Sequence, residues 1–339
     1  MKAVVLYGPH NVSVGELPVP ELLSGYIKVK VAYCGLCGSD LHKVAGKKNT
    51  HPVKYPVALG HEMSGVVAEV GEGVTEFKVG DRVTVDPNWS CGKCKYCKAG
   101  KPSFCEHGRG VVKGMAEYVV SPEENVYHIP DSLPLRSAAL AEPVACCLRG
   151  MDLLNIRSGE SVALIGFGAI GAIMLQLIRN AGAGEIAVIE YNEERRELAK
   201  KLGADYFFAS NDTEAIEKYA SEHVIDKVIE CVGKSAAHET ALNVAGRGAT
   251  VVMFGVADSA GKTDVSFYDA FSKELTIKTS FVNPHTTERA VRLLASGRLD
   301  VDNIFSAELT MEEMVDEVLA PKHCRRGKVL CCVDPTLEK

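Results

Sequence analysis

The chain has 339 residues, of which 46% are hydrophobic and 24% charged, with a formal net charge of −6 and a pI near 6.0. This length predicts two domains, because single hydrophobic cores stop growing at about 250–300 residues. The acidic balance excludes the basic footprint of a nucleic-acid-binding protein. A membrane span is not expected either, because the longest apolar stretch, Val162 to Ile178, is short and contains three glycines.

Residues 1–140 predict a β-rich region. Short apolar runs separated by Gly, Pro and Asp indicate strands, and long helical periodicity is absent. The clearest runs are YIKVKVAY (26–33), SGVVAEVG (64–71), DRVTVD (81–86) and AEYVVS (116–121). The opening MKAVVLYGP lacks the apolar length of a secretory signal, so we expect a cytoplasmic protein, in which disulfides are rare.

Two segments of this region carry residue types that bind metals. They contain Cys34, Cys37, Ser39, His42, His61 and Glu62. A catalytic zinc takes mixed sulfur, nitrogen and oxygen ligands and keeps one position open, and Cys37, His61 and a carboxylate would meet that need. A Cys34–Cys37 redox pair is the alternative, but that motif precedes a helix and no helix is evident after Cys37. Each histidine taken alone could also be structural.

The segment CGKCKYCKAGKPSFC holds four thiols within fifteen residues. They are Cys91, Cys94, Cys97 and Cys105. Bacterial iron–sulfur runs end with a three-residue gap and a proline, whereas seven residues precede the last cysteine here. Four cysteines on short turns are typical of a structural zinc site, which would stabilise a lobe with little apolar core. Four protein ligands leave no open position, so this metal is not catalytic.

Glu142 is a third candidate. It precedes Pro143, which suits the first position of a helix, so Glu142 is expected at a helix start near the junction of the two domains. The alternative is a carboxylate that only caps this helix.

From residue 143 onward, strands and helices alternate. The strand-like segments are SVALIG (161–166), EIAVIE (185–190), VIDKVIECVG (224–233) and ATVVMFGV (249–256). The helical segments between them are Ala169–Ala181, Glu193–Leu202, Thr213–Ser221 and Ser235–Val244. This alternation predicts an α/β domain with a parallel sheet. A further strand (274–282), an amphipathic helix (285–297) and a closing strand (327–334) follow.

A glycine-rich loop lies between the first of these strands and its helix. It contains Gly166, Gly168 and Gly171 in the spacing G-x-G-x-x-G. In this context the motif indicates a dinucleotide, whose pyrophosphate meets the helix N-terminus. Glu190, at the end of the next strand, is placed to bind the adenosine ribose, which favours NAD over NADP. Arg195 and Arg196 follow and could instead accept a 2′-phosphate or line a solvated helix face.

Together these motifs resemble the zinc-containing medium-chain alcohol dehydrogenase family over essentially the whole chain. The matching motifs are Cys37-Gly-Ser39-Asp-Leu-His42, Gly60-His61-Glu62, the four-cysteine segment, the glycine loop and Gly327-Lys328-Val329. The resemblance implies a β-rich GroES-like zinc catalytic domain over residues 1–142 and 276–339. It also implies a Rossmann NAD-binding domain, a doubly wound parallel sheet, over residues 143–275, with the active site in the cleft between the two domains.

The resemblance further implies two Zn²⁺ ions per chain and the residues that serve them. The catalytic ion would be held by Cys37, His61, Glu62 and Glu142, and the structural ion by Cys91, Cys94, Cys97 and Cys105. Ser39 and His42 would relay the proton. The dinucleotide would meet Gly166, Gly168, Ala169, Ile170, Gly171, Glu190, Arg195, Val232, Gly255, Val256, Ser280 and Phe281. The family pairs subunits through the Rossmann domain, so we expect a homodimer or homotetramer.

Glu142-Pro143 resembles the polyol (sorbitol-like) dehydrogenase branch, which predicts NAD-dependent oxidation of a polyol or sugar alcohol. Leu148-Arg149 departs from the Leu-His pair of that branch, and the loop from Gly108 to Tyr118 is short and weakly polar. An amino alcohol, a phosphorylated sugar, butanediol or a steroid hydroxyl therefore remain alternative substrates. A non-catalytic nucleotide-binding protein is the alternative class, and the presence of every expected zinc ligand argues against it.

Overall fold

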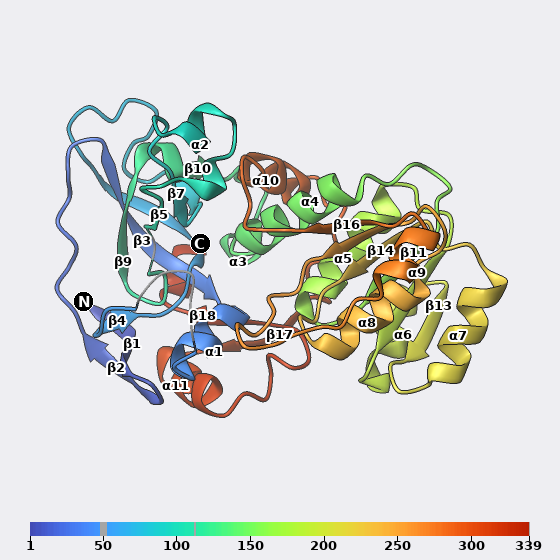
Figure 1. Cartoon of the computed structure of the whole chain (residues 1–339). Helices are drawn as coiled ribbons and strands as arrows, with labels where there is room; N and C mark the ends of the chain where they lie inside the picture. Colours follow the sequence, from blue (N-terminus) through green and yellow to red (C-terminus); the bar gives the residue numbers. More distant parts are fainter. Residues whose placement is uncertain (48–52, 112, 339) are drawn as a thin grey trace. The chain divides into compact units, whose positions relative to one another are not determined.

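The computed structural model describes residues 1–47, 53–111 and 113–338. Contacts divide the chain into two units (Figure 1). The first comprises Met1–Ala145, Val282–Gly297 and Phe305–Lys339, and the second Cys146–Phe281 and Arg298–Ile304. The domain limits expected after residues 142 and 275 remain a prediction.

A seven-stranded sheet forms the framework of the first unit. Its order is β10 (Val126–His128), β6 (Arg82–Val85), β5 (Glu62–Val70), β3 (Tyr26–Gly35), β18 (Lys328–Cys332) and β17 (Phe305–Leu309), and β9 (Tyr118–Pro122) also pairs with β3. The β-rich character predicted from the short apolar runs is confirmed. The strand predicted near the C-terminus is β18, which lies antiparallel to β3 and so joins distant parts of the chain.

Smaller elements complete the first unit. Two further sheets contain β2 (Asn11–Glu16), β1 (Lys2–Gly8) and β4 (Val57–Ala58) in that order, and β7 (Asn88–Trp89) with β8 (Arg109–Gly110). The helices are α1 (Gly38–Val44), α2 (Lys95–Lys98), α3 (Leu135–Ala138), α10 (Thr287–Ala295) and α11 (Met311–Leu319), and α4 (Ala141–Leu154) runs from this unit into the second. Apolar side chains of β1, β3, β5, β6, β18 and α11 form one core.

The second unit contains a six-stranded parallel sheet, as predicted. Its order is β13 (Tyr206–Ala209), β12 (Ile186–Glu190), β11 (Val162–Ile165), β14 (Lys227–Glu230), β15 (Thr250–Met253) and β16 (Thr276–Thr279). Its helices are α5 (Ala169–Asn180), α6 (Arg196–Lys201), α7 (Thr213–Glu222), α8 (Ser235–Val244) and α9 (Phe267–Ser272). The helix predicted to begin at Glu193 begins instead with a 3₁₀ turn over Glu193–Arg195.

The strand order of this sheet reverses between β11 and β14. The chain first moves outward through β12 and β13, and then returns to place β14 and β15 on the other side of β11. Such a switch point opens a crevice at the carboxyl ends of the central strands, where α/β proteins bind ligands. The glycine loop (residues 166–171) follows β11 at this point. No helix of the described residues is long and apolar enough to cross a membrane.

Candidate active site

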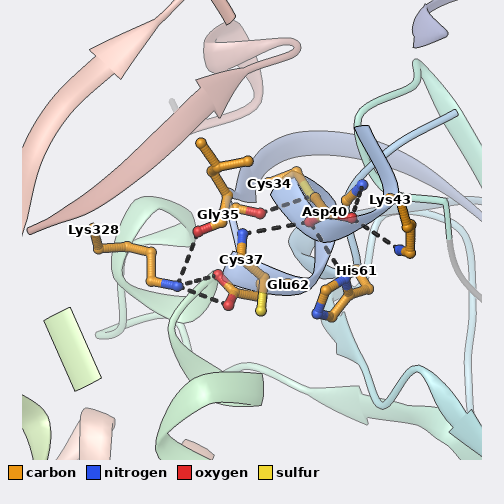
Figure 2. Close-up of polar contacts among 10 residues, drawn as sticks. Cys34, Gly35, Cys37, Asp40, Lys43, His61, Glu62 and Lys328 are labelled. Atoms are coloured by element: carbon orange, nitrogen blue, oxygen red, sulfur yellow. Dashed lines mark hydrogen bonds and ion pairs between the residues drawn. The ribbon is translucent and has the colours of Figure 1, made fainter. Parts of the chain in front are cut away.

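Three of the predicted metal ligands come together in the first unit. Ligand atoms of Cys37, His61 and Glu62 all lie within 4.8 Å of one another (Figure 2). The pairing of β3 with β5 explains this, because Gly35 lies opposite Glu62 and brings the chain before Cys37 beside the start of β5. A Cβ at residue 35 would lie 2.1 Å from Glu62 Oε2, so a larger residue there would displace the Glu62 carboxylate.

Asp40 holds the residues around this group in place (Figure 2). Its buried carboxylate accepts hydrogen bonds from Lys43 Nζ at 2.9 Å, from the Gly60 backbone N–H at 3.2 Å and from the Cys37 backbone N–H at 3.4 Å. Oδ2 lies 3.5 Å from His61 Nδ1, which orients the ring and leaves Nε2 free to face a metal. Burial alone would raise the pKa of Asp40, but His61 and Lys43 hold it well below its usual value.

Lys328 forms a buried ion pair with Glu62. Its Nζ lies 2.7 Å from both carboxylate oxygens and also donates to the Leu36 carbonyl at 3.2 Å. Lys328 and Glu62 side chains are 4% and 1% exposed. Burial would lower the pKa of Lys328, but the charges of Glu62 and Cys37 keep it above its usual value, so the lysine is charged. The motif Gly327-Lys328-Val329 was recognised in the sequence, but it did not predict the ion pair of Lys328 with Glu62.

The other predicted residues of this site are placed differently. Among the described residues, Glu142 is not part of the group within 4.8 Å; it lies buried in the first turn of α4 and contributes to the electrostatic field at Lys328. Ser39 and His42 lie on α1, directly after Cys37. The relay assigned to these two residues remains a prediction.

The expectation that no helix follows Cys37 is wrong, because α1 begins at Gly38. The helix has only seven residues and starts with glycine, so its intrinsic propensity is weak. Asp40 stabilises its first turn by accepting the Cys37 N–H. Cys34 is nevertheless no partner of Cys37 in a disulfide, because it is a free thiol buried in β3, opposite Cys331.

The four-cysteine lobe (residues 91–105) has the geometry of a zinc site. The four Sγ atoms all lie within 4.8 Å of one another, with 3.6 Å between those of Cys94 and Cys97 and 3.9 Å between those of Cys94 and Cys105. A tetrahedral zinc with bonds of about 2.3 Å places its sulfurs about 3.8 Å apart, which fits these values. Backbone N–H groups of Cys97 and Glu106 lower the pKa of Cys94 to about 6. All four are free cysteines, as a metal site requires.

The glycine loop of the second unit is tightly built. Gly166 has a φ of +87°, and a Cβ at Gly171 would lie 2.2 Å from the Gly166 carbonyl oxygen. Gly168 is the N-cap of α5, followed by Ala169 and Ile170. The N-terminal N–H groups of this helix therefore face the switch point, as a bound pyrophosphate requires.

Glu190 and Arg195 lie beside this loop. The buried Glu190 carboxylate accepts the Phe167 N–H at 2.6 Å and the Asn192 N–H at 2.9 Å, so it also fixes the loop itself. The Arg195 guanidinium lies over the Phe167 ring, 5.0 Å from its centroid. Arg195 is 6% exposed, and its Nε and Nη2 have no hydrogen-bond partner among the described residues. Buried donors of this kind are placed to bind an acceptor that does not belong to the chain itself.

The remaining predicted cofactor residues follow three neighbouring strands at the same end of the sheet. Val232 follows β14, Gly255 and Val256 follow β15, and Ser280 and Phe281 follow β16. Val232, Val256 and Phe281 are exposed, at 41%, 74% and 42%. Ser280 Oγ is buried without a hydrogen-bond partner in the described part of the chain. The carboxyl ends of parallel strands thus bring together residues predicted from separate segments.

Comparison with known proteins assigns the family. Residues 24–131 match the alcohol dehydrogenase GroES-like domain, and residues 169–296 match the zinc-binding dehydrogenase domain. Sorbitol dehydrogenase of Bacillus subtilis is 30% identical over 93% of this chain and 92% of its own length. D-xylulose reductase A of Aspergillus oryzae is 31% identical over 91% of this chain and 90% of its own length.

Solved structures agree over nearly the whole chain. A chain from Sinorhizobium meliloti 1021, described as a zinc-binding dehydrogenase and solved with NADP, has a TM-score of 0.92 and 35% identity, covering 98% of both chains. A chain from Escherichia coli CFT073, described as a short chain alcohol dehydrogenase and solved with NADH, has a TM-score of 0.87 and 29% identity, covering 98% of this chain and 99% of its own. The protein belongs to the zinc-binding medium-chain dehydrogenase family, which confirms the resemblance and the α/β fold.

Proposed function

We propose that the protein is a zinc-dependent oxidoreductase that transfers a hydride between NAD(H) and a secondary alcohol or ketone. The substrate class that we favour is a polyol or sugar alcohol. The observation that carries the proposal is the Cys37–His61–Glu62 group, a mixed donor set, on a chain that also has a dinucleotide loop. The polyol class is supported by the relatives that act on sorbitol and xylulose.

The donor sets fit two zinc ions of different roles. Cys37, His61 and Glu62 would hold the catalytic ion, and the four-cysteine lobe would hold the structural ion. Glu142, whose charge acts on Lys328, is a further proposed ligand of the catalytic ion. At the three-ligand group, zinc supplies a Lewis acid that lowers the pKa of a substrate hydroxyl. Asp40 orients His61, and Lys328 balances the charge of Glu62.

The proton released from the substrate needs a path to solvent. By resemblance to the family, Ser39 would accept this proton and His42 would deliver it to solvent. Both residues lie on α1, directly after Cys37, and an imidazole can both accept and donate a proton. Nicotinamide supplies the hydride chemistry, and the protein positions it.

Glu190 is proposed to determine the preference for NAD. Replacing it with alanine should weaken NAD⁺ binding about 10- to 100-fold, since one hydrogen bond to a charged group contributes about 1.5–3 kcal/mol. The ratio of kcat/KM for NAD⁺ to that for NADP⁺ should fall, because the carboxylate no longer repels a 2′-phosphate. Glu193→Ala, which removes an exposed carboxylate three residues away, is the matched control. An unchanged ratio would exclude Glu190 as the ribose ligand.

The proposed homo-oligomer would use the edge of the parallel sheet. β16 is the last strand of its sheet, and the side chains of Phe267, Tyr268 and Phe271 on α9 are 82%, 77% and 82% exposed. Edge strands and large exposed aromatic side chains mark association surfaces. The double variant Phe267→Glu/Phe271→Glu should therefore be a monomer by light scattering, whereas Val79→Glu, at a valine 63% exposed in the first unit, should keep the wild-type mass. Identical masses for all three proteins would exclude this surface.

The proposed activity is tested by following reduction of NAD⁺ and NADP⁺ with a panel of alcohols. The panel contains sugar alcohols and their phosphates, threonine, butanediol, simple secondary alcohols and hydroxysteroids. Activity on a sugar alcohol supports the polyol class, and activity confined to another member replaces it with that class. Cys37→Ala should be inactive while it retains the zinc of the four-cysteine lobe. A wild-type protein that binds two zinc ions and oxidises no member would contradict the proposed substrate class.

A further inference from the structure

Glu230 is a buried carboxylate at the switch point, and none of the roles described above includes it. It ends β14 and is 0% exposed. Its Oε1 accepts the backbone N–H groups of Val232 at 2.5 Å and Gly233 at 2.7 Å. Its backbone carbonyl accepts those of Phe254 and Gly255, each at 2.9 Å. One residue therefore holds the two loops that follow β14 and β15.

These two loops pack tightly against each other and against the glycine loop, with no room for a side chain at the glycines where they meet. A Cβ at Gly233, whose φ is +77°, would lie 2.5 Å from the Val256 carbonyl oxygen, and a Cβ at Gly255 would lie 2.2 Å from the Gly233 nitrogen. A Cβ at Gly166 would lie 2.5 Å from Val232 Cγ2. A shift of the turn at residues 231–233, which carries the proposed cofactor contact Val232, therefore displaces the loop after β15, which carries the proposed contacts Gly255 and Val256.

His238 is the group that faces the other oxygen of Glu230. Glu230 Oε2 is buried and has no hydrogen-bond partner among the described residues, and His238 Nε2 lies 3.5 Å from it. His238 Nδ1 lies 2.9 Å from Thr263 Oγ1. Both ring nitrogens have a suitable partner when the threonine hydroxyl donates to Nδ1 and the N–H at Nε2 points to the carboxylate.

The same helix is tied to the segment after β15 at a second point. Ser235 Oγ donates to the Lys262 carbonyl at 2.6 Å, one turn before His238 on α8. Residues 262 and 263 are thus fixed to α8 by two side chains. The polar chain from Thr263 through His238 to Glu230 connects this exposed segment with the buried end of β14.

We propose that His238 is a positioning residue for the dinucleotide. By facing Glu230 Oε2, it keeps the carboxylate in the orientation in which Oε1 holds the turn at residues 231–233. Without the imidazole, the buried carboxylate oxygen loses the N–H that faces it, so the side chain turns toward water and releases the two backbone N–H groups. The inference rests on the proposed function, because it takes these loops to contact NAD(H).

The test compares variants by NADH titration, using the fluorescence of the bound nicotinamide, and by thermal unfolding. His238→Phe keeps the ring but removes both polar atoms, and its Kd for NADH should rise about tenfold, the equivalent of one buried hydrogen bond. At saturating NAD⁺, kcat should stay within about twofold of the wild-type value, because His238 touches no reacting atom. His238→Gln should restore most of the affinity, since its amide nitrogen can reach the position of Nε2.

The matched control is His223→Phe, which alters another histidine of the second unit. His223 hydrogen-bonds the Tyr219 carbonyl and stacks on the Tyr219 ring, and it does not contact Glu230 or Thr263. A lower melting temperature with an unchanged Kd should appear only for this control. The same result for His238→Phe would overturn the proposal and leave the histidine a purely structural role.

A milder variant guards against a failure of His238→Phe to fold. Thr263→Val removes only the hydroxyl that faces Nδ1, and it should raise the Kd for NADH about threefold. Equal affinities of Thr263→Val and wild type, in the absence of a folded His238→Phe protein, would overturn the proposal. A wild-type protein that binds neither NADH nor NADPH would instead overturn the proposed function, and this inference with it.

Discussion

Lys328→Met is expected to lower the free energy of unfolding by about 3–5 kcal/mol, since the substitution leaves the buried Glu62 carboxylate without its partner. Both side chains are almost fully excluded from water, and both carboxylate oxygens face the ammonium at 2.7 Å. The measurement is urea denaturation of wild type and variant after the same chelator treatment, because a zinc ion at Glu62 would itself offset the carboxylate charge. Dehydrogenase activity of the zinc-loaded proteins is measured in parallel. Activity should fall too, because Glu62 would then be free to leave its place beside Cys37 and His61.

A double variant separates the charge from the packing. In Glu62→Gln/Lys328→Met the neutral amide needs no counter-charge, so a large part of the stability should return although the aliphatic chain and zinc ligand have changed. The control is Lys28→Met, which removes the lysine of the Lys28–Glu69 pair, where Glu69 is 55% exposed. This pair should contribute less than about 1 kcal/mol. Equal urea midpoints for Lys28→Met and Lys328→Met would contradict the role assigned to Lys328.

The parts of the site that the sequence predicted are those encoded within short segments. The glycine loop between a strand and a helix, the carboxylate at Glu190 and the four cysteines of the lobe each depend on spacing over at most about twenty residues. Local geometry follows from such spacing, because a strand, a tight turn and a helix start place their side chains in fixed directions. The alternation of strands and helices predicted the parallel sheet for the same reason.

The supporting contacts could not be predicted, since they depend on pairing between distant strands. Lys328 reaches Glu62 only because β18 lies beside β3, which in turn pairs with β5. Asp40 lies inside a recognised motif, yet its contact with His61 requires the same pairing. The short helix α1 was missed because tertiary contacts and one capping carboxylate stabilise it, and its sequence has little intrinsic helix propensity.

Glu142 is another residue whose local sequence predicts only part of its position. Its place at the start of α4 follows from the proline after it, and the structure confirms a helix over Ala141–Leu154. Its distance from Cys37 depends on how α4 packs on the first unit, which no local pattern encodes. Among the described residues, the charge of Glu142 acts on Lys328, but Glu142 is not part of the Cys37–His61–Glu62 group. Its part in zinc binding remains a proposal.

The four-cysteine lobe should depend on its metal for stability. Cys97→Ser is expected to lower the zinc content from two ions per chain to one. The melting temperature should fall by about 10 °C or more, because the free energy of zinc binding contributes directly to the stability of the lobe. Zinc is measured by atomic emission and unfolding by circular dichroism. The matched control is Cys332→Ser, which alters a partly buried thiol outside both metal groups and should keep both ions.

The expected size of this effect follows from the lack of an apolar core in the lobe. α2 contains no buried residue, and the aromatic side chains of Tyr96, on α2, and Phe104, in the turn that follows, are 38% and 54% exposed. Backbone N–H groups already point at the sulfurs of Cys91 and Cys105, so the loop is shaped around thiolates and not around packed side chains. Removing one sulfur therefore removes the centre of the lobe. A Cys97→Ser protein with two zinc ions and an unchanged melting temperature would show that other contacts hold these residues together.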